Sequence, residues 1–263
     1  MTIQAKVDTI LKAKLLPSGM LAANERVPIK KGQTLQVSSV FPAKDQHLEL
    51  TLIDHKFDRG YVYAPHWNYQ ADQIILPASY YYQTDNPSGE GFRECCGTSN
   101  AMMLNYLLNG WLDEQAQEDG IKQPESIYLA ELANEGDTTD HGANTRALRR
   151  FGVESYWATN LTFDFYYKSI RNNIPVVMGL VYKGPNHGHV VCGVGFKLRS
   201  KIIVHDPYGA REGATNFWLS NLPEAGKNDE YTVQTLSQIW LPEVNDGHGR
   251  VVTAIKGVKT VFG

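Results

Sequence analysis

Three short apolar runs in the second half of the chain constrain its fold more than any other feature. They are residues 176–181, 189–196 and 201–206, and glycine-bearing loops separate them. Strands this apolar are usually central in a sheet whose two faces are both covered. The runs therefore predict an antiparallel sheet, and the residues upstream of them must supply the elements that cover it.

Helical patterns occur in the region that would cover such a sheet. One helix is predicted to begin at or just after Cys96 and to end at the Asn-Gly pair at 109–110. Two more are predicted over 145–151, closed by Gly152, and over 163–172, before Pro175. Helices beside an antiparallel sheet predict the α+β class for this part of the chain.

The first 67 residues have a different texture. Residues 34–40 alternate between apolar and polar, and 47–52 alternate again with Leu48, Leu50 and Leu52 on one face. Residues 61–64 continue the pattern, which predicts a small all-β barrel. We therefore expect two domains, an all-β barrel at 1–70 and an α+β domain at 71–263, with the boundary near residue 70.

Composition excludes several classes of protein. The 263 residues contain 25 Lys and Arg against 28 Asp and Glu, so the net charge is −3. The chain has no block of basic residues, and we therefore do not expect nucleic acid as a partner. The sequence contains no run of about 18 apolar residues, so we expect no membrane span. The first residues lack the apolar region of a secretory signal. We expect a monomer made in the cytosol.

The cysteines raise the question of a nucleophile. Cys95, Cys96 and Cys192 are the only three, and two are adjacent, which disfavours a disulfide framework and favours a reducing compartment. Cys96 is expected at a helix start, where free N–H groups and the helix dipole lower a thiol pKa. Taken alone, Cys96 could equally be a small packing residue. Cys95 is interpreted as packing.

A thiolate nucleophile needs a base and a group that orients the base. His189 opens one apolar run and Asp206 ends the next, so pairing of these strands would bring both side chains to the same rim of the sheet. Gln83, in an irregular stretch upstream of Cys96, is the candidate oxyanion donor beside the Cys96 backbone N–H. This chemistry requires neither a cofactor nor a metal.

Four motifs occur in the order found in one enzyme family. They are residues 76–87, 96–99 (Cys-Gly-Thr-Ser), 188–191 (Gly-His-Val-Val) and 206–209 (Asp-Pro-Tyr-Gly). Over about 75 to 255 the chain resembles the bacteriocin-leader-peptidase-like, or double-glycine peptidase-like, cysteine peptidases of the papain-like clan. The resemblance implies a papain-like fold with Cys96 as nucleophile, His189 as base, Asp206 as its orienting group and Gln83 in the oxyanion hole. Thr98 departs from the proline usual in the family.

The N-terminal region resembles a bacterial SH3-like barrel, in residues 27–32, 35–37 and 61–63. Such barrels commonly bind cell-wall peptides in lytic enzymes, which implies a peptidoglycan-directed, endolysin-like peptidase whose substrate is a stem or cross-bridge peptide. Without a secretory signal, such an enzyme would reach the wall only after release. A structural cap that packs on the peptidase is the alternative for the barrel.

Other hypotheses stay open on the sequence alone. His187, His189, His205 and Asp206 offer enough nitrogen and oxygen ligands for zinc, although a metal centre would leave Gln83 and the Cys-Gly helix start unexplained. Residues 135–142 form an acidic loop that fits helix capping better than calcium binding. A non-catalytic peptide-binding or wall-binding protein on the same fold is the alternative to an enzyme.

Overall fold

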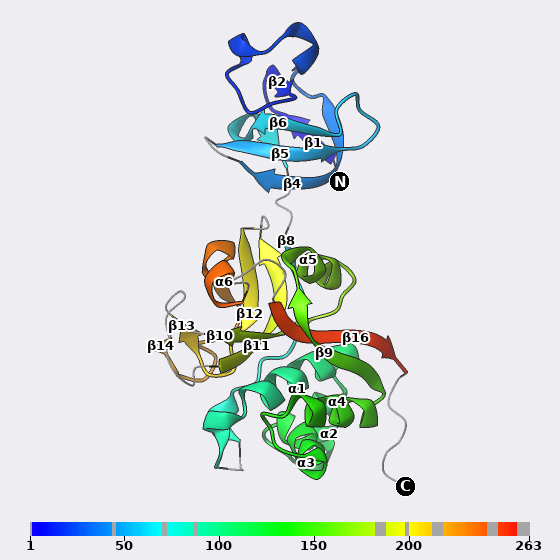
Figure 1. Ribbon diagram of the computed structural model, residues 1–263, viewed down its shortest axis with the longest axis vertical. Helices are drawn as coiled ribbons and strands as arrows, with labels where there is room; N and C mark the ends of the chain where they lie inside the picture. Colours follow the sequence, from blue (N-terminus) through cyan, green and yellow to red (C-terminus); the bar gives the residue numbers. More distant parts are fainter. Residues whose placement is uncertain are drawn as a thin grey trace. The chain divides into compact units, whose positions relative to one another are not determined.

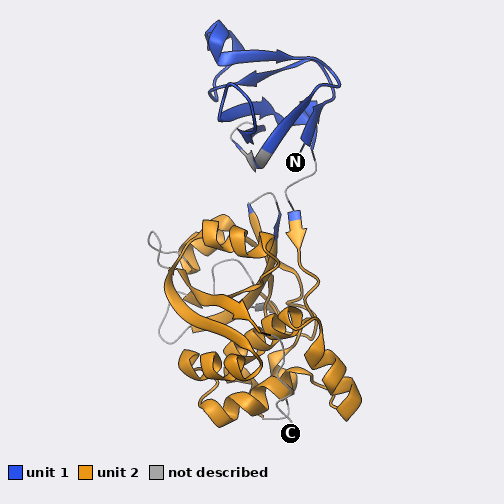
Figure 2. Cartoon of the chain, turned by 90° about the vertical axis from the view of Figure 1, so that its right-hand side faces the viewer, with its two compact units in different colours: residues 1–73, 196–200 blue, residues 74–195, 201–263 orange. Residues whose placement is uncertain are grey.

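The computed structural model describes residues 2–43, 46–69, 73–86, 89–181, 188–197, 200–211, 218–240 and 247–256. The chain forms two compact units, residues 1–73 with 196–200, and residues 74–195 with 201–263 (Figure 2). The first division, after residue 73, lies close to the expected boundary near residue 70. Each unit has a hydrophobic core of its own.

The N-terminal unit consists of strands and short 3-10 helices, as its alternating patterns predict. Its strands lie antiparallel in the order β3-β2-β6-β5-β4-β1-β7. Leu48, Leu50 and Leu52 are buried on one face of β5, in a core that also contains Val62 and Trp67. The strands are β1 (Thr2–Ala5), β2 (Thr9–Lys12), β3 (Arg26–Ile29), β4 (Thr34–Pro42), β5 (His47–Leu52), β6 (Arg59–Tyr63) and β7 (Trp67–Asn68); the 3-10 helices are Ser18–Met20, Ala23–Glu25 and Ala64–His66.

In its described residues, the second unit combines six α-helices with antiparallel sheets, which confirms the α+β class. Its helices are α1 (Cys95–Leu107), α2 (Trp111–Asp119), α3 (Glu125–Glu135), α4 (His141–Arg150), α5 (Phe163–Arg171) and α6 (Val233–Ile239). Its strands are β8 (Gln73–Ile75), β9 (Val153–Leu161), β10 (Val176–Val181), β11 (Gly188–Lys197), β12 (Lys201–His205), β13 (Ala210–Arg211), β14 (Trp218–Ser220), β15 (Asp229–Thr232) and β16 (Gly247–Ile255); Gln83–Asp85 and Gly91–Arg93 are 3-10 turns.

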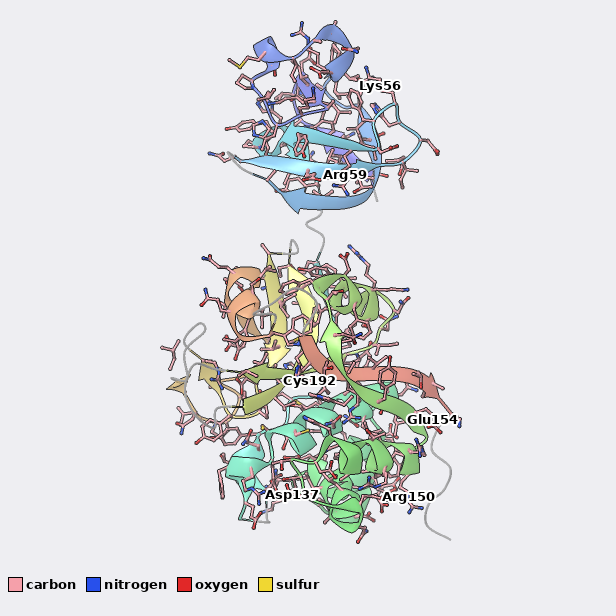
Figure 3. The ribbon with its side chains drawn as sticks, viewed as in Figure 1. Lys56, Arg59, Asp137, Arg150, Glu154 and Cys192 are labelled. Atoms are coloured by element: carbon pink, nitrogen blue, oxygen red, sulfur yellow. The ribbon has the colours of Figure 1, made fainter. Side chains whose placement is uncertain are left out.

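The main sheet of this unit has the order β15-β12-β11-β10-β16-β9, and β8 also pairs with β11. The three apolar runs are thus three adjacent strands, β10, β11 and β12. Helices cover both faces, because Cys192 of β11 packs in the core beneath α1 while Gly193 of the same strand lies against Tyr166 of α5. Figure 1 shows α1 to α4 grouped on one side of the sheet and α5 on the other, and Figure 3 marks Cys192 in the interior.

Helix α1 carries the adjacent cysteines. It begins at Cys95, one residue before the expected start, with Glu94 as its N-cap, and it ends before the Asn-Gly pair as predicted. All residues from Cys96 to Asn105 are buried. The helix is therefore enclosed on every side, because α3 and α4 contact it as well as β10. None of the helices in the described ranges has both the length and the apolar character needed to cross a bilayer.

Candidate active site

Two neighbouring strands bring His189 and Asp206 together. His189 is the second residue of β11, and Asp206 directly follows β12. His189 Nε2 lies 2.7 Å from Asp206 Oδ1, and both side chains are buried. The rim contact expected from strand pairing is therefore present. Since Nε2 is engaged with the carboxylate, Nδ1 is the ring nitrogen that remains for another partner.

Four groups hold the carboxylate of Asp206. Oδ1 also accepts a hydrogen bond of 3.0 Å from the backbone N–H of Tyr208, while Oδ2 accepts one of 2.8 Å from the Tyr231 hydroxyl. Arg211 Nε lies 3.6 Å from Oδ2. Burial opposes the charged form of Asp206, but the charge and hydrogen bond of His189, together with Arg211 and Tyr208, lower its pKa below the usual value. The group is thus a buried carboxylate with both oxygens engaged.

His189 is held in its charged form by its neighbours. Burial by itself lowers the pKa of an imidazole, yet the charge and hydrogen bond of Asp206, followed by a hydrogen bond to Cys95, outweigh burial and raise the pKa of His189 to about 9. At neutral pH the ring is therefore an imidazolium between a carboxylate and a thiol. This is the arrangement that favours a thiolate.

The cysteine that contacts His189 is Cys95, and this differs from the sequence-based expectation. Cys95 is partly exposed, whereas Cys96 is only 2% exposed and packs in the hydrophobic core. Successive residues of a helix point about 100° apart, so only one of two adjacent side chains can face His189. The packing role expected for Cys95 belongs to Cys96, and the contact expected for Cys96 belongs to Cys95.

Cys96 has polar neighbours of its own, although it also lines the pocket that contains Cys95 and His189. Its Sγ accepts a hydrogen bond of 3.5 Å from Asn100 Nδ2 and lies 3.6 Å from His141 Nδ1. Burial, followed by the neighbouring Cys95, raises the pKa of Cys96 to about 12, despite the opposing effect of Arg250. At neutral pH Cys96 is a thiol.

A pocket of about 310 Å³ is lined by Cys95, Cys96 and His189. Trp157 and His141 also line it, and their rings stack 3.6 Å apart at an interplanar angle of 8°. Burial and the nearby Arg250 lower the pKa of His141 to about 4, so this ring is neutral at pH 7. None of the described residues that line the pocket carries a carboxylate or a lysine or arginine side chain. The pocket is therefore a mainly apolar recess that includes the thiol–imidazolium pair.

Gln83 lies near this region but is turned elsewhere. It is 1% exposed, its Nε2 donates a hydrogen bond of 2.6 Å to the Gly91 carbonyl, and its backbone N–H donates to the Pro207 carbonyl. Gln83 is not among the residues that line the pocket. An amide nitrogen carries two hydrogens, so one donor remains beyond the bond to Gly91. Its role in an oxyanion hole stays a prediction.

The alternative metal centre loses one of its ligands. His205 Nδ1 accepts from the Asn228 backbone N–H and its Nε2 donates to the Ala78 carbonyl, so both ring nitrogens serve the backbone. His187 lies outside the described residues.

In the acidic loop, Asp140 caps α4 by accepting from the Gly142 N–H, and Asp137 accepts from Thr139 and Arg93. These contacts agree with helix capping.

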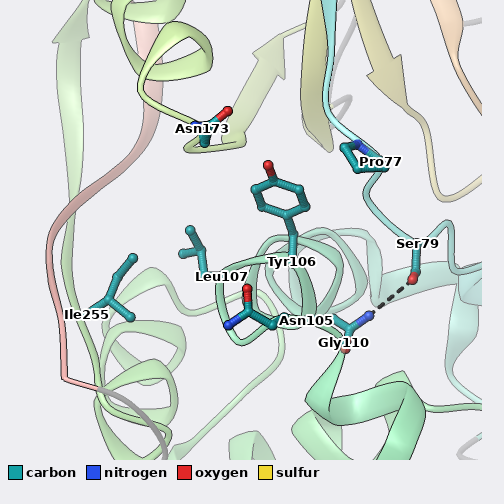
Figure 4. Close-up of a pocket in the computed structure, with 9 residues that line it drawn as sticks. Pro77, Ser79, Asn105, Tyr106, Leu107, Gly110, Asn173 and Ile255 are labelled. Carbon is teal, nitrogen blue, oxygen red and sulfur yellow. Dashed lines mark hydrogen bonds between the residues drawn. The ribbon is translucent and has the colours of Figure 1, made fainter.

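A second hollow, of about 710 Å³, lies at the other end of α1 and is lined by different residues (Figure 4). Asn105, Tyr106 and Leu107 of α1 face it together with Pro77 and Ile255. Asn105 Nδ2 donates to Ser79 Oγ and to Asp113, and Asn105 Oδ1 accepts from the Leu112 N–H. The Asn105 and Ser79 side chains therefore serve the local fold, and no cysteine or histidine is among the described residues that line this hollow.

Comparison with known families assigns the second unit. Residues 75–240 match the Peptidase_C39 like family, which is more than half of the chain. The chain belongs to this family. Membership identifies the chain as a cysteine peptidase, a hydrolase whose substrate is a peptide. The expectation of a cysteine peptidase is therefore confirmed. Among curated proteins, none matches this chain.

The match of this C39-like chain includes the cysteine pair, His189 and Asp206, and it leaves the N-terminal unit outside. Sequence reasoning did not identify the pocket residue His141, nor Tyr231 and Arg211 beside Asp206. Tyr231 lies on β15, far along the chain from the four motifs, while Arg211 lies on β13, two residues after the last motif. The sheet order β15-β12 brings Tyr231 to the carboxylate, and the turn after Asp206 returns Arg211 to it.

Proposed function

We propose that this C39-like peptidase cleaves peptide bonds with Cys95 as nucleophile, His189 as general acid and base, and Asp206 as the group that orients the imidazole. The observation that carries the proposal is the single imidazole that bonds Asp206 through Nε2 and lines one pocket with the partly exposed Cys95 thiol, which also helps to raise the pKa of that imidazole. Cys95 replaces Cys96 in the role implied by the sequence resemblance, because Cys96 is 2% exposed and its Sγ lies beside Asn100 and His141.

The proposed reaction follows from this order of groups. The Cys95 thiolate attacks the scissile carbonyl carbon, so that a C–S bond forms and the carbonyl electron pair moves to oxygen. Collapse of this intermediate breaks the C–N bond, and the imidazolium of His189 gives its proton to the leaving amine. Water then attacks the thioester while His189 accepts a proton from it. The C–S bond breaks, the acid product leaves, and the thiolate–imidazolium pair is restored.

The developing oxyanion needs donors that are already in place. Backbone N–H groups in the first turn of α1 lack partners within the helix and lie beside Cys95, where the positive end of the helix dipole also favours negative charge. The free hydrogen of the Gln83 amide is the proposed second donor.

Alanine variants of the three cysteines test the proposal. Cys95→Ala is expected to lower kcat by on the order of 10⁴-fold or more, because the nucleophile is lost. Cys96→Ala and Cys192→Ala should retain activity within about tenfold, since both thiols are buried packing groups. Thermal unfolding of each variant provides the control for folding. An active Cys95→Ala enzyme, or an inactive but folded Cys96→Ala enzyme, would contradict the assignment.

For the substrate, we infer a stem or cross-bridge peptide of peptidoglycan, which the peptidase would reach at the cell wall after release, acting as a monomer in the manner of an endolysin. Two points support this. The mainly apolar pocket beside Cys95, which has no carboxylate, lysine or arginine among its described lining residues, suits small, uncharged peptide residues, and the N-terminal unit, with a core of its own, resembles an SH3-like wall-binding barrel.

The substrate is tested by digesting purified peptidoglycan with the full chain and identifying the released muropeptides by mass spectrometry. New amino termini in the wild-type digest that are absent with Cys95→Ala would support the proposal. The inactive Cys95→Ala chain should also sediment with intact walls. If soluble peptides are cleaved and walls are neither cleaved nor bound, the enzyme is a peptidase of another peptide class.

A further inference from the structure

The oxygen of Asp206 that faces away from His189 is held by side chains from two other strands. The Tyr231 hydroxyl of β15 donates to Oδ2 at 2.8 Å, and Arg211 Nε of β13 lies 3.6 Å from the same atom. Tyr231 is 3% exposed and Arg211 is 4% exposed. Both contacts are therefore made out of water, where a hydrogen bond to a charged group has its largest effect.

A carboxylate with no exposed surface is costly unless both of its oxygens are engaged. Oδ1 of Asp206 is engaged by His189 and the Tyr208 N–H. The stability of the ionised form therefore depends on the groups that contact Oδ2. The charged and titratable groups around Asp206 are His189 on β11, Arg211 on β13, Asp229 and Tyr231 on β15, and Tyr80 before the Gln83–Asp85 turn. Of these, Tyr231 makes the short contact to Oδ2.

We propose that Tyr231 is a positioning residue of this active site, which keeps Asp206 ionised and fixes the rotation of its carboxylate toward His189, with Arg211 as a second support. The proposal rests on the proposed roles of His189 and Asp206. Two anchored oxygens leave the carboxylate one orientation, and β15 delivers Tyr231 because it pairs with β12, the strand that ends at Asp206.

The matched test is a pair of tyrosine-to-phenylalanine variants. Tyr231→Phe removes the hydroxyl that donates to the carboxylate, while Tyr80→Phe removes a hydroxyl that donates to the backbone carbonyl of the same residue, at 2.9 Å. Loss of the Tyr231 donor makes Asp206 easier to protonate. The acid limb of the kcat/KM profile should therefore move upward by about one pH unit, a tenfold change in the ionisation constant.

The alkaline limb, which reports His189, and KM should change little in Tyr231→Phe, and Tyr80→Phe should leave both limbs where they are in the wild type. A merely structural loss would lower activity at all pH values without moving a limb. An acid limb at the wild-type position in folded Tyr231→Phe, or an equal shift in Tyr80→Phe, would overturn the proposal.

If Tyr231→Phe does not fold, Arg211→Lys weakens the other contact to Oδ2 and should move the acid limb in the same direction. A stationary limb in that folded variant would be evidence against the proposal. Failure of the proposed function has a different signature, because Asp206→Asn would then keep full activity. The titration of His189 by NMR in full-length Cys95→Ala gives a readout independent of turnover, with its low-pH transition higher in the Tyr231→Phe background.

Discussion

Cys95 and Cys96 are adjacent in the chain and line the same pocket, yet the two thiols have different neighbours. Cys95 lies beside the imidazole of His189, which bonds the buried carboxylate of Asp206, while Cys96 is 2% exposed and its Sγ lies beside Asn100 and His141. The two thiols share one helix turn. The comparison teaches that neighbours across the fold, and not the helix start common to both residues, set the chemistry of a thiol.

The electrostatics around the two thiols are opposite. Asp206 raises the pKa of His189 to about 9, so a positive charge stands beside Cys95. Beside Cys96, burial and Arg250 lower the pKa of His141 to about 4, so this histidine of the same pocket is uncharged. A thiol next to an imidazolium is activated, whereas a buried thiol next to a neutral imidazole is not.

The largest expected effect comes from removing the charge beside Cys95. Asp206→Asn should lower kcat by on the order of 10³–10⁴-fold, because the buried imidazole loses the partner that keeps it charged and oriented. Steady-state kinetics on a peptide substrate measure the loss. Asp113→Asn is the matched control, since Asp113 accepts hydrogen bonds from Ser79 and Tyr81 away from the pocket. Equal losses in both variants would remove the distinction between the two thiols.

Thiol reactivity provides a direct comparison. At pH 7 Cys95 should react with iodoacetamide at least about 10²-fold faster than Cys96 and Cys192, because the latter are buried and burial raises the pKa of both. Peptide mapping by mass spectrometry at timed intervals gives the three rates. Preferential labelling of Cys96 would mean that its surroundings open to solvent, which contradicts the burial described above.

The pH profile sharpens the comparison through His189. Its folded-state pKa is raised, so the imidazolium is present below about pH 9 and is lost as the pH rises through that value. We expect kcat/KM to fall by about tenfold per pH unit above that point, because the acid that protonates the leaving amine is lost. In Asp206→Asn this limb should move to lower pH, since the largest influence that opposes burial is then lost. A profile that stays flat through pH 10 would argue against a charged His189.

The smallest effect on activity is expected at Cys96. Cys96→Ala removes one buried atom from a packed site and should lower the free energy of unfolding by about 1 kcal/mol, with kcat changed less than about threefold. Urea unfolding measures the first quantity and initial rates the second. Cys192→Ala, at another fully buried cysteine, provides the matched comparison. A large loss of activity with unchanged stability in Cys96→Ala would reverse the proposed roles of the two cysteines.

Much of the scaffold could be predicted because it depends on local patterns. The run at 176–181 is β10 at the expected residues. The helix predicted over 145–151 covers the second half of α4, and the helix predicted over 163–172 covers α5, each extending one residue past its end. The segments that became α2, α3, β9 and β16 were not predicted. Residues 111–135 have many polar side chains on short helices, so apolar periodicity is weak there.

By itself, the sequence determined the α+β class, the three strands β10, β11 and β12 of the main sheet, and the proximity of His189 to Asp206, because alternation, apolar runs and strand ends are local properties of the chain. Only the tertiary structure decided which thiol meets the imidazole. Helix α1 is buried on all sides from Cys96 to Asn105, so its apolar pattern marks no single inward face and fixes no rotation. The packing of α1 against α3, α4 and the sheet sets that rotation, and it turns Cys95 toward His189 and Cys96 into the core.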